Sequence, residues 1–512
     1  MKTSKFTSTV SGAAIFIAVV SILSKGLGFL REILFAGIYG LSTEFDIYLI
    51  GAVIPLTINT IILCIGQNYF IPTYNKAKSD NTINLNVFVR TNFYLFIVAG
   101  LVLALILYMN RENILDLFLG GSEQNIIQTT NHVFILFLLS IPITAGISIL
   151  IGYQQSNHEF RYSIISNIIP NITVLFFVYF WGSDMIVAIP IGFIVGNLIQ
   201  ISYLMFSSKE LFTKVNASIS QLTLLLKSSL SSILIVVLIE SIGQLYLISD
   251  RLFYESITEG GISALSYAQT IFFLPISILT ISLSTAIFPK FSILYQEKKK
   301  EELERIFSTG ILISVGIFVP IMILFIFYGD TITKIFFERG KFSFIDTVKT
   351  SDVLSYYAFG IIFYSIYGVI NKLLYSIGMI KKLLLITIIG IVLKIILNII
   401  LVEQYEQNGL AVSTTLSYLF FFVTSFFIVN KNILNSKRKV FIPNLVYYSV
   451  NALAAFIFTK IFVQFMQAFH IGTFYEIIIF ITVYSTNLFI VKSNLLNIFS
   501  SIINNFSMSY KS

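Results

Sequence analysis

The chain has 512 residues, of which 56% are hydrophobic and 11% are charged. Soluble domains carry about 25% charged residues, so this composition excludes a soluble protein of this length. The single cysteine excludes an internal disulfide and a thiolate cluster, and the three histidines are too widely spaced for a metal motif. We therefore expect an all-α polytopic membrane protein with no metal site and no cofactor.

Apolar blocks of membrane-spanning length, separated by short polar breaks, predict about fourteen transmembrane helices. The N-terminal block has the charge and hydropathy of a signal peptide, but further spans follow it directly, so we expect a retained first helix. The loops are too short to hold an extramembrane catalytic domain, which argues against an enzyme. The predicted spans are 10–38, 45–72, 86–109, 131–153, 162–182, 185–206, 226–250, 262–291, 307–328, 353–377, 383–402, 409–430, 443–468 and 476–492.

Lysines and arginines are distributed unevenly between the two sides of this topology. With the N-terminus in the cytoplasm, the cytoplasmic segments contain about 23 of them and the outer segments about six, as the positive-inside rule requires. We therefore expect both termini in the cytoplasm. The same distribution accounts for the net charge of +8 without a nucleic-acid partner.

The first span carries two cations, Lys25 and Arg31, inside an apolar run. A cation near the bilayer centre costs about 2.5–3.5 kcal/mol, so two of them indicate a water-filled or anion-filled interior. Snorkelling from a helix end explains one of the pair more easily than both. Their spacing places the charges about 9 Å apart along the helix and about 120° apart around it. Gly26 and Gly28 are candidate hinges, because a bend there turns both charges inward.

Such a pair of cations suits a diphosphate with an attached sugar. Guanidinium grips phosphate bidentately, whereas ammonium acts as a point charge. The structural alternative is that Arg31 pairs with Glu32, or with Asp46 at the start of the second span. We expect Asp46 to contact one of the two cations and to hold the site together when it is empty.

Opposite charges also lie deep in the second half of the chain. Glu240 is in the middle of the seventh span and Lys394 in the middle of the eleventh, so an ion pair is the least costly way to bury both. The functional alternative is a coupling site, at which protonation or sodium binding biases one access state. Asn398 and Thr414 are expected to complete this polar cluster. Arg251, at the outer end of the seventh span, forms a boundary pair with the preceding aspartate or lines the outer gate.

Prolines recur at similar places in the second and eighth spans. Pro55 and Pro72 lie in one, and Pro275 and Pro289 in the other, about 220 residues later. A proline kinks its helix, which membranes tolerate where the bend lines a cavity. Pro55 and Pro275 are therefore further candidate hinges.

This weak repeat predicts two pseudo-symmetric lobes around a central cavity, followed by an additional pair of helices. Lys460, in the thirteenth span, has no predicted partner and is expected to snorkel. The predicted divisions are an N-lobe at 1–215 with helices one to six, a C-lobe at 216–435 with helices seven to twelve, and helices thirteen and fourteen at 436–512.

Several stretches resemble the MurJ/MviN family of lipid II flippases, which belongs to the superfamily of multidrug and polysaccharide exporters. The resemblance covers nearly the whole chain and includes the fourteen-helix count. Its most specific parts are S-K-G-L-G-F-L-R-E-I-L-F-A-G-I-Y-G at Ser24–Gly40 and the G-K-F of the stretch F-E-R-G-K-F at Phe337–Phe342. Further support comes from Asp46, Ser266–Ala268 before Pro275, and Asn398 with Asn408–Ala411.

The resemblance implies transport of undecaprenyl-pyrophosphate-linked saccharide from the inner to the outer leaflet of the bacterial plasma membrane by alternating access. Carried over by position, Lys25 and Arg31 are the diphosphate cations and Asp46 is their neighbour. The family also implies a side groove for the lipid tail, which we place at helices thirteen and fourteen. Some relatives hold a cation where Lys394 lies, and its ammonium can take the place of that ion.

The chain departs from the family at two positions that usually hold arginine. Here they hold Asn59 or Thr60 in the second span, and Thr270 just before Pro275. A flippase for an O-antigen, capsule or exopolysaccharide unit therefore remains the first alternative. A cation-coupled multidrug antiporter predicts acidic residues in the first half and twelve helices. A membrane-embedded polymerase or ligase predicts a large outer loop with histidine, which the outer segment 329–352 lacks.

Overall fold

The computed structural model describes residues 10–80, 84–212, 237, 240–241, 243–246, 248–432, 438–466 and 472–490. Every regular element in these ranges is a helix, which confirms the predicted all-α class. Ten helical segments within them are long and apolar enough to cross a membrane. The chain divides into two compact units, Met1–Ser263 and Ala264–Ser512. The predicted boundary at 215–216 lies outside the described residues, and the total of fourteen spans stays a prediction.

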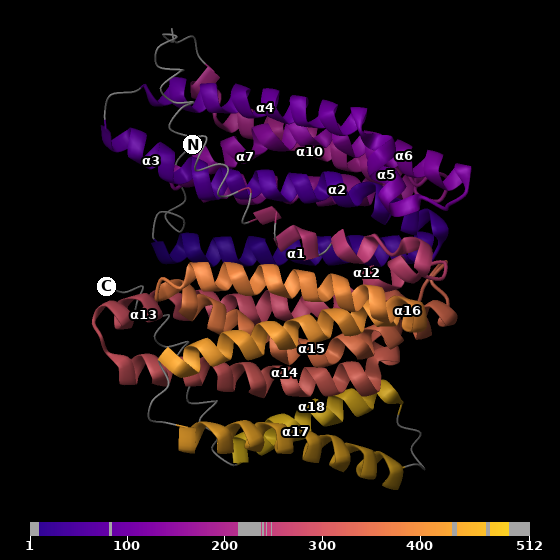
Figure 1. The fold of residues 1–512 in the computed structure, drawn as a ribbon, viewed down its shortest axis with the longest axis vertical. Coiled ribbons are helices and arrows are strands. Elements are labelled where there is room, and N and C mark those ends of the chain that lie inside the picture. The colour runs from indigo at the N-terminus through magenta and orange to yellow at the C-terminus, as the bar shows by residue number, and fades with distance from the viewer. Residues whose placement is uncertain are drawn as a thin grey trace. The chain divides into compact units, whose positions relative to one another are not determined.

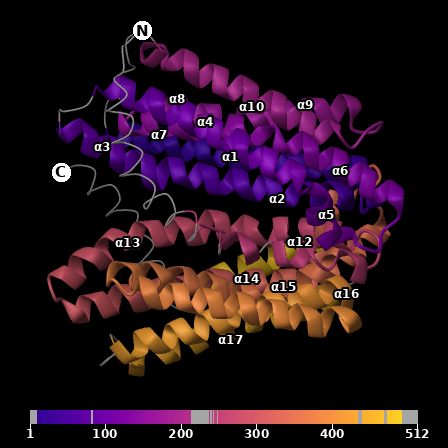
Figure 2. The same ribbon diagram turned by 45° about the horizontal axis from the view of Figure 1, so that its top comes forward.

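The first unit is a set of packed helices that follow the predicted spans (Figures 1 and 2). The predicted second span is one continuous run from α2 to α3, and the predicted fourth span is α6 followed by α7. Most of the predicted seventh span lies outside the described residues. The elements are α1 (Val10–Tyr39), α2 (Thr43–Ile65), the π-helical turn η1 (Gly66–Phe70), α3 (Ile71–Asp80), α4 (Leu85–Met109), α5 (Arg111–Leu119), α6 (Gln124–Leu138), α7 (Ser140–Ser156), α8 (Phe160–Ser166), α9 (Ile169–Trp181), α10 (Ala188–Ser207), and the short 3₁₀ turns η2 (Lys209–Phe212) and η3 (Tyr254–Ser256).

A close approach between α2 and α7 accompanies the π-helical turn in the second span. The turn begins at Gly66, where an added Cβ would overlap the side chain and carbonyl of Ser148. The hydroxyl of Ser148 donates to the Ile62 carbonyl at 2.7 Å. A glycine is required here because only a residue without a side chain lets the two backbones come this close. The distortion of the second span therefore lies at Gly66, whereas α2 continues through Pro55.

The second unit contains the longer helices (Figure 1). Pro275 ends α12 and a π-helical turn follows it at once, so the eighth span is distorted at the predicted proline. The backbone of α14 leaves helical geometry at Tyr328. The elements are α12 (Gly261–Pro275), which begins at the boundary between the units, the π-helical turn η4 (Ile276–Thr280), α13 (Ile281–Gln296), α14 (Lys300–Phe337), α15 (Phe344–Ser376), α16 (Ile380–Asn432), α17 (Arg438–Phe465) and α18 (Thr473–Ile490).

The helix α16 is a hairpin of two spans. Its 53 residues would extend about 80 Å as a straight helix, far more than the roughly 30 Å of a bilayer core. The chain reverses at Glu406, whose φ is 46° and ψ is −129°. Ser413 on the second arm donates a hydrogen bond to Asn398 on the first, which is possible only after a reversal. The two arms correspond to the predicted spans 383–402 and 409–430.

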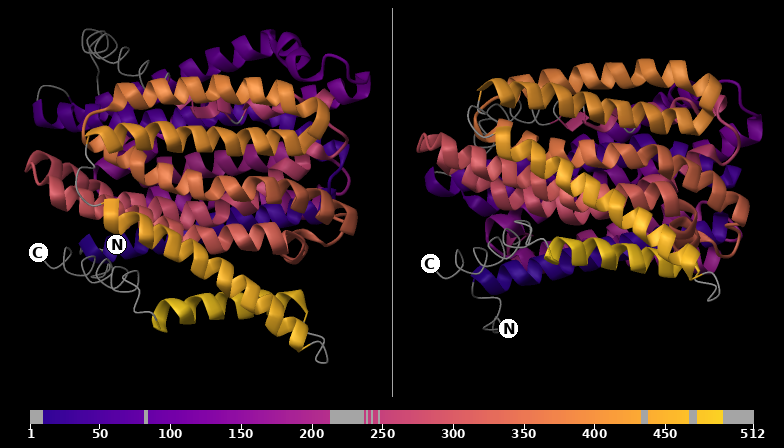
Figure 3. Two further views of the ribbon diagram at one scale, coloured as in Figure 1. Left: turned by 60° about the horizontal axis from the view of Figure 1, so that its bottom comes forward. Right: turned by 90° about the horizontal axis from the view of Figure 1, so that it is seen from below.

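The last two helices pack against α14 in the core of the second unit. Phe480 of α18 and Ala452 and Ala455 of α17 are fully buried in that core. Tyr484 of α18 donates a hydrogen bond to the Gly316 carbonyl of α14 at 2.6 Å. Figure 3 shows α17 and α18 in yellow as a hairpin. These contacts attach the hairpin to α14 along its length.

Candidate functional site

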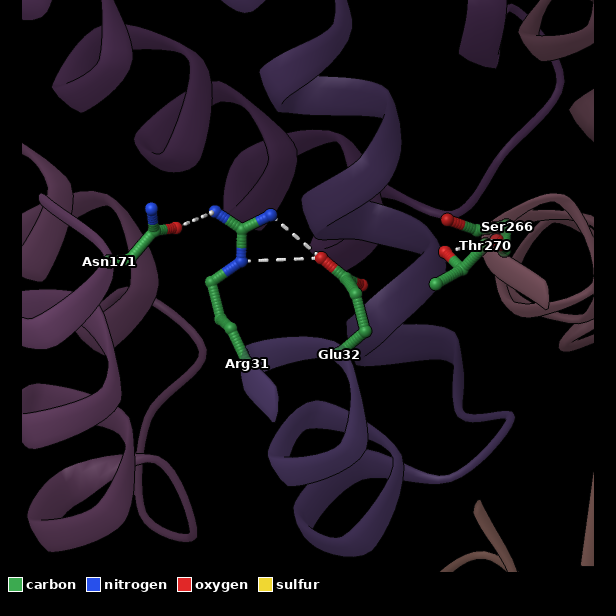
Figure 4. A network of polar contacts seen from close by, with 5 residues as sticks. All are labelled: Arg31, Glu32, Asn171, Ser266 and Thr270. Carbon is green, nitrogen blue, oxygen red and sulfur yellow. Dashed lines mark hydrogen bonds and ion pairs between the residues drawn. The ribbon is translucent and has the colours of Figure 1, made fainter. Parts of the chain in front are cut away.

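Arg31 of α1 is held by a carboxylate and an amide (Figure 4). Its Nε and Nη2 donate to the Glu32 carboxylate at 3.2 and 2.8 Å, and its Nη1 donates to Asn171 Oδ1 of α9 at 3.3 Å. The Arg31 side chain is 27% exposed and that of Glu32 is 15% exposed. The ring of Phe35, one turn further along α1, lies 5.6 Å from the guanidinium carbon. The guanidinium is therefore held in one orientation and is partly accessible.

The local sequence around Lys25 leaves space beside the helix. Lys25 is exposed, and α1 continues without interruption through Gly26 and Gly28. A Cβ at Gly26 would meet no atom within 4 Å, and one at Gly28 would meet Asn171 Oδ1 at 4.0 Å. The surface of α1 is thus open at Gly26, and Asn171 lies against the helix at Gly28. The predicted hinge at these glycines stays a prediction, because α1 is helical at both.

Asp46 has different partners from those we expected. Its carboxylate accepts hydrogen bonds from the backbone amides of Gly260 at 2.8 Å and Ser263 at 2.7 Å, and from the Ser263 hydroxyl. The expected contact with Arg31 is not among its hydrogen bonds, since Arg31 pairs with Glu32, the alternative considered above. The physical reason is that two backbone amides and a hydroxyl already satisfy this buried carboxylate. Asp46 is 1% exposed.

Arg251 is attached to the segment that Asp46 also holds, and its role at an outer gate stays a prediction. Its Nη1 donates to the Ile262 carbonyl at 3.1 Å, within the segment that Asp46 holds, and its charge acts on the Asp46 carboxylate. Burial raises the pKa of the neighbouring Tyr254 phenol to about 12, and the charges of Asp46, Glu259 and Glu255 raise it further. Arg251 and Asp46 therefore both bind the segment around Ile262.

Glu240 belongs to the first unit and has an amide partner there. Asn68, in the π-helical turn of the second span, donates from Nδ2 to Glu240 Oε1 at 3.3 Å. Cys64, one turn before, also interacts with this carboxylate. Sequence reasoning missed Asn68, although an asparagine inside an apolar span is a signal of a polar contact. The predicted ion pair of Glu240 with Lys394 stays a prediction.

Lys394 lies in a fully buried polar cluster inside the α16 hairpin. Lys394 and Asn398 are both 0% exposed, and Asn398 accepts a hydrogen bond from Ser413 on the other arm. Thr414 is 3% exposed and Ser417 is 0% exposed. Lys394 and Asn398 are four residues apart and so share one face of their arm. The prediction that Asn398 and Thr414 complete a cluster with Lys394 stays a prediction, and Ser413 and Ser417 are buried residues of this hairpin that the sequence did not single out.

The two positions at which the family usually has arginine hold neutral residues here. Asn59 is buried in α2 and donates to the Ser140 hydroxyl at 2.6 Å. Thr270 of α12 donates to the Ser266 carbonyl of its own helix at 3.0 Å (Figure 4). Neither residue supplies a cation.

Lys460 is paired, contrary to the expectation that it snorkels alone. Its Nζ lies 2.7 Å from Glu476 Oε2 of α18. Glu476 stood at the predicted start of the fourteenth span, where a charge usually indicates a helix boundary. No pattern in the sequence around the two residues indicates that they meet.

Comparison with known proteins identifies the family. A family model described as "Lipid II flippase MurJ" matches residues 35–480. A Buchnera aphidicola (subsp. Acyrthosiphon pisum) protein named "Probable lipid II flippase MurJ" is 25% identical over 479 residues, covering 91% of this chain and 92% of that protein. A Thermosipho africanus protein named "Lipid II flippase MurJ" is 26% identical over 462 residues, covering 86% and 91%.

Solved structures support the fold. A structure described as "Lipid II flippase MurJ, inward closed conformation" aligns with a TM-score of 0.77 at 23% identity, covering 94% of this chain and 100% of that one. An inward-facing multidrug resistance MATE family transporter of the MOP superfamily aligns with a TM-score of 0.64 at 13% identity, covering 80% and 94%. Both have the architecture that the sequence resemblance implied.

Proposed function

Because the chain belongs to the MurJ family of lipid II flippases, we propose that it carries lipid II, the peptidoglycan precursor, from the inner to the outer leaflet of the bacterial plasma membrane. It is a multi-pass membrane protein and a transporter rather than an enzyme. The observation that carries the proposal is the partly accessible Arg31 guanidinium, held by Glu32 and Asn171 in a helix of membrane-spanning length. Burying a cation at such a position is unfavourable in free energy, and binding of an anion offsets this cost.

Arg31 and Lys25 bind the diphosphate of the substrate. Glu32 occupies two of the donors of Arg31, and Asn171 accepts from the third nitrogen at 3.3 Å. An incoming diphosphate replaces the neutral amide most easily, because an anionic acceptor forms the stronger hydrogen bond with guanidinium. Lys25, exposed and six residues earlier, adds a point charge. Asp46 acts by holding the segment before α12 rather than by touching the diphosphate.

The proposed topology places both termini in the cytoplasm, since most lysines and arginines then lie on the cytoplasmic side. The N-lobe at 1–215 and the C-lobe at 216–435 change conformation so that the substrate site is open first to one leaflet and then to the other. Gly26, Gly28, Pro55 and Pro275 are proposed as the places where helices bend. The π-helical turn directly after Pro275 supports this role for the eighth span, because π-helical turns occur often at functional distortions.

Lys394 supplies a built-in positive charge to the C-lobe. The residue is 0% exposed and four residues from Asn398, which accepts a hydrogen bond from Ser413. A buried ammonium on the same helical face as Asn398 can take the place of a bound cation, as the family resemblance implies. We therefore propose that transport by this chain does not require sodium. Glu240 remains the candidate for proton coupling, with Asn68 as its neutral partner.

Helices α17 and α18 form the groove for the lipid tail. Val446, Val450, Leu453 and Ile457 of α17 are each about half exposed. Their spacing of four, three and four residues places them in one apolar row. A polyprenyl chain that lies along this row exchanges the contacts of bulk lipid for contacts with the protein.

Transport by purified protein in lipid vesicles tests the proposal. Vesicles receive either lipid II or a lipid-linked O-antigen unit in the inner leaflet, and appearance of the saccharide outside is measured. Selective movement of lipid II, together with rescue of cells depleted of their own lipid II flippase, is the expected result. Movement of the O-antigen unit alone would assign the chain to polysaccharide export instead.

A further inference from the structure

A cavity lies between α5 and α6, two neighbouring helices of the first unit (Figures 1 and 2). Its volume is about 530 Å³, within the range of pockets that hold small organic ligands. Its α5 wall consists of Glu112, Leu115, Asp116 and Leu119. These residues are spaced three, one and three apart, so they form one stripe along the helix. The cavity is therefore built on a regular helix face rather than on a loop.

The opposite wall is a stripe of α6 with the same spacing. Gln124, Ile127, Gln128 and Asn131 line the cavity from this helix. The α5 stripe contributes two carboxylates, and the α6 stripe contributes three amides. Leucine and isoleucine side chains supply the apolar part of the lining. This lining suits a cation with an aliphatic portion, because carboxylate and amide oxygens accept hydrogen bonds and the apolar side chains contact carbon.

One amide oxygen in the cavity lining is buried without a partner. No described residue donates a hydrogen bond to Oδ1 of Asn131. A buried acceptor that is unsatisfied is unfavourable in free energy, and a donor on a bound ligand removes that penalty. Asn131 therefore indicates a ligand with a hydrogen-bond donor, independently of the carboxylates on the opposite wall.

The charge of the cavity depends mainly on Asp116. The carboxylate of Glu112 is paired with Arg111, with Oε1 and Nη2 2.9 Å apart. Asp116 is in none of the ion pairs among the described residues. It lies in the last turn of α5, which has no basic residue, and the negative end of the helix dipole disfavours a carboxylate there. A cation bound in the cavity offsets both effects.

Contacts outside the cavity hold its two walls in place. Phe118 of α5 is 3% exposed and packs in a buried cluster with Ile50 of α2. The turn between α5 and α6 is bound by Glu255, which accepts hydrogen bonds from the Gly121 amide and, at 3.4 Å, from the Ser122 hydroxyl. The walls are therefore preformed, which lowers the entropic cost of binding a ligand.

The lining does not favour a metal ion. The described part of the chain contains no group of three or more histidine, cysteine, aspartate or glutamate side chains that could hold one. Calcium takes six to eight oxygen ligands at about 2.3–2.6 Å, so it needs a small and wholly polar site. This cavity has the volume of an organic molecule and has leucine and isoleucine in its walls.

We propose that the α5–α6 cavity binds an alkylammonium ion, with the charge facing Asp116 and the carbon chain against Leu115, Leu119 and Ile127. In the proposed topology the cavity lies on the outer side of the membrane. The same chemistry occurs in a free aliphatic diamine and in the lysine side chain of a peptide. The inference is independent of the proposed function, because binding to this cavity does not require transport.

Binding to the purified full-length protein in detergent tests the proposal. Equilibrium dialysis measures the affinity for radiolabelled cadaverine and for Nα-acetyl-lysine amide, and the tighter ligand identifies the source of the ammonium group. We expect saturable binding that weakens as the salt concentration rises. Asp116→Asn should weaken binding about tenfold, because it removes the main charge of the cavity. Glu112→Gln should weaken it less, since that carboxylate is shared with Arg111.

Two further variants separate the cavity from a general effect of charge. Asn131→Leu keeps the size of the side chain but removes its acceptor, so it should weaken binding about fivefold. Asp184→Asn is the matched control, because Asp184 is an exposed carboxylate elsewhere in the first unit that accepts from Ser183. It should bind both amines as tightly as wild type. Thermal unfolding of each variant shows whether it is folded.

The inference is overturned if wild-type protein binds neither amine, or if Asp116→Asn binds them as tightly as wild type. Binding of calcium but of neither amine would assign the cavity to a metal ion instead. Should Asp116→Asn fail to fold, Gln128→Trp replaces it, because this exposed position of α6 lets a large side chain fill the cavity. Gln128→Trp should abolish binding, and unchanged affinity in that variant would place the amine elsewhere.

Discussion

Ser263 donates two hydrogen bonds to Asp46, one from its backbone amide at 2.7 Å and one from its hydroxyl. The amide of Gly260 completes the arrangement at 2.8 Å from the other carboxylate oxygen. Since α12 begins at Gly261, Asp46 caps this helix from a distant point in the sequence. A carboxylate is favourable there because the first amides of a helix lack internal partners and carry partial positive charge.

Removal of this carboxylate should destabilise the protein. Asp46→Ala leaves the amides of Gly260 and Ser263 unsatisfied, so we expect a loss of about 2–3 kcal/mol in the free energy of unfolding. Asp46→Asn, which keeps one acceptor oxygen, should lose less. Thermal unfolding in detergent measures both. Asp184→Ala is the control, because Asp184 is exposed and accepts from the adjacent Ser183. An equal loss in Asp46→Ala and Asp184→Ala would contradict the capping role.

Substitution of Arg31 should abolish transport without removing the protein from the membrane. Arg31→Ala deletes the guanidinium, and Arg31→Lys keeps the charge but loses the bidentate geometry, so a partial loss is expected. Arg111→Ala is closely matched, since Arg111 also pairs with the following glutamate at 2.9 Å and lies 4.6 Å from a tyrosine ring. Rescue of flippase-depleted cells and membrane abundance are measured together. Normal rescue by Arg31→Ala would remove this residue from the site.

Neutralising both Glu240 and Lys394 distinguishes a structural ion pair from a coupling site. If they form only an ion pair, Glu240→Gln with Lys394→Met should transport normally, and each single change should be more harmful than the double change. If Glu240 couples transport to protons, the double variant should lose transport while its abundance stays normal. The initial rate in vesicles with and without a pH gradient distinguishes the two outcomes.

Replacement of sodium should leave the transport rate unchanged. We expect equal rates in sodium and in potassium media, because the Lys394 ammonium provides the positive charge inside the α16 hairpin. Lys394→Ala, which empties that position, should lower the rate in both media. A rate that falls when sodium is withdrawn from wild-type protein would show that the ammonium does not replace a bound ion.

Packing at the π-helical turn should depend on glycine. An added methyl group at Gly66 overlaps Ser148, so Gly66→Ala should lower the free energy of unfolding by about 1–3 kcal/mol. Gly26→Ala, where a Cβ meets no atom within 4 Å, should be neutral or slightly stabilising. Chemical unfolding of the two variants gives the comparison. Similar stabilities would mean that α2 and α7 adjust without cost.

Local pairs were open to prediction from the sequence, whereas distant ones were not. Arg31 and Glu32 are neighbours in the chain, so their pairing was one of two alternatives considered. The partners of Asp46 lie 214 and 217 residues away, and a carboxylate satisfied by backbone amides leaves no pattern in the side chains. Glu476 stood at a predicted helix end, and nothing in its neighbourhood indicated Lys460.

The sequence by itself determined that the chain is helical, that it crosses a membrane repeatedly and that Arg31 lies within a span. These properties follow from hydropathy and helical period, which act between residues close along the chain. Tertiary structure alone decided that Asp46 caps α12, that Ser413 meets Asn398 across a reversal, and that Lys460 meets Glu476. Such contacts depend on how helices pack, because a buried charge takes whichever partner the neighbouring helix presents.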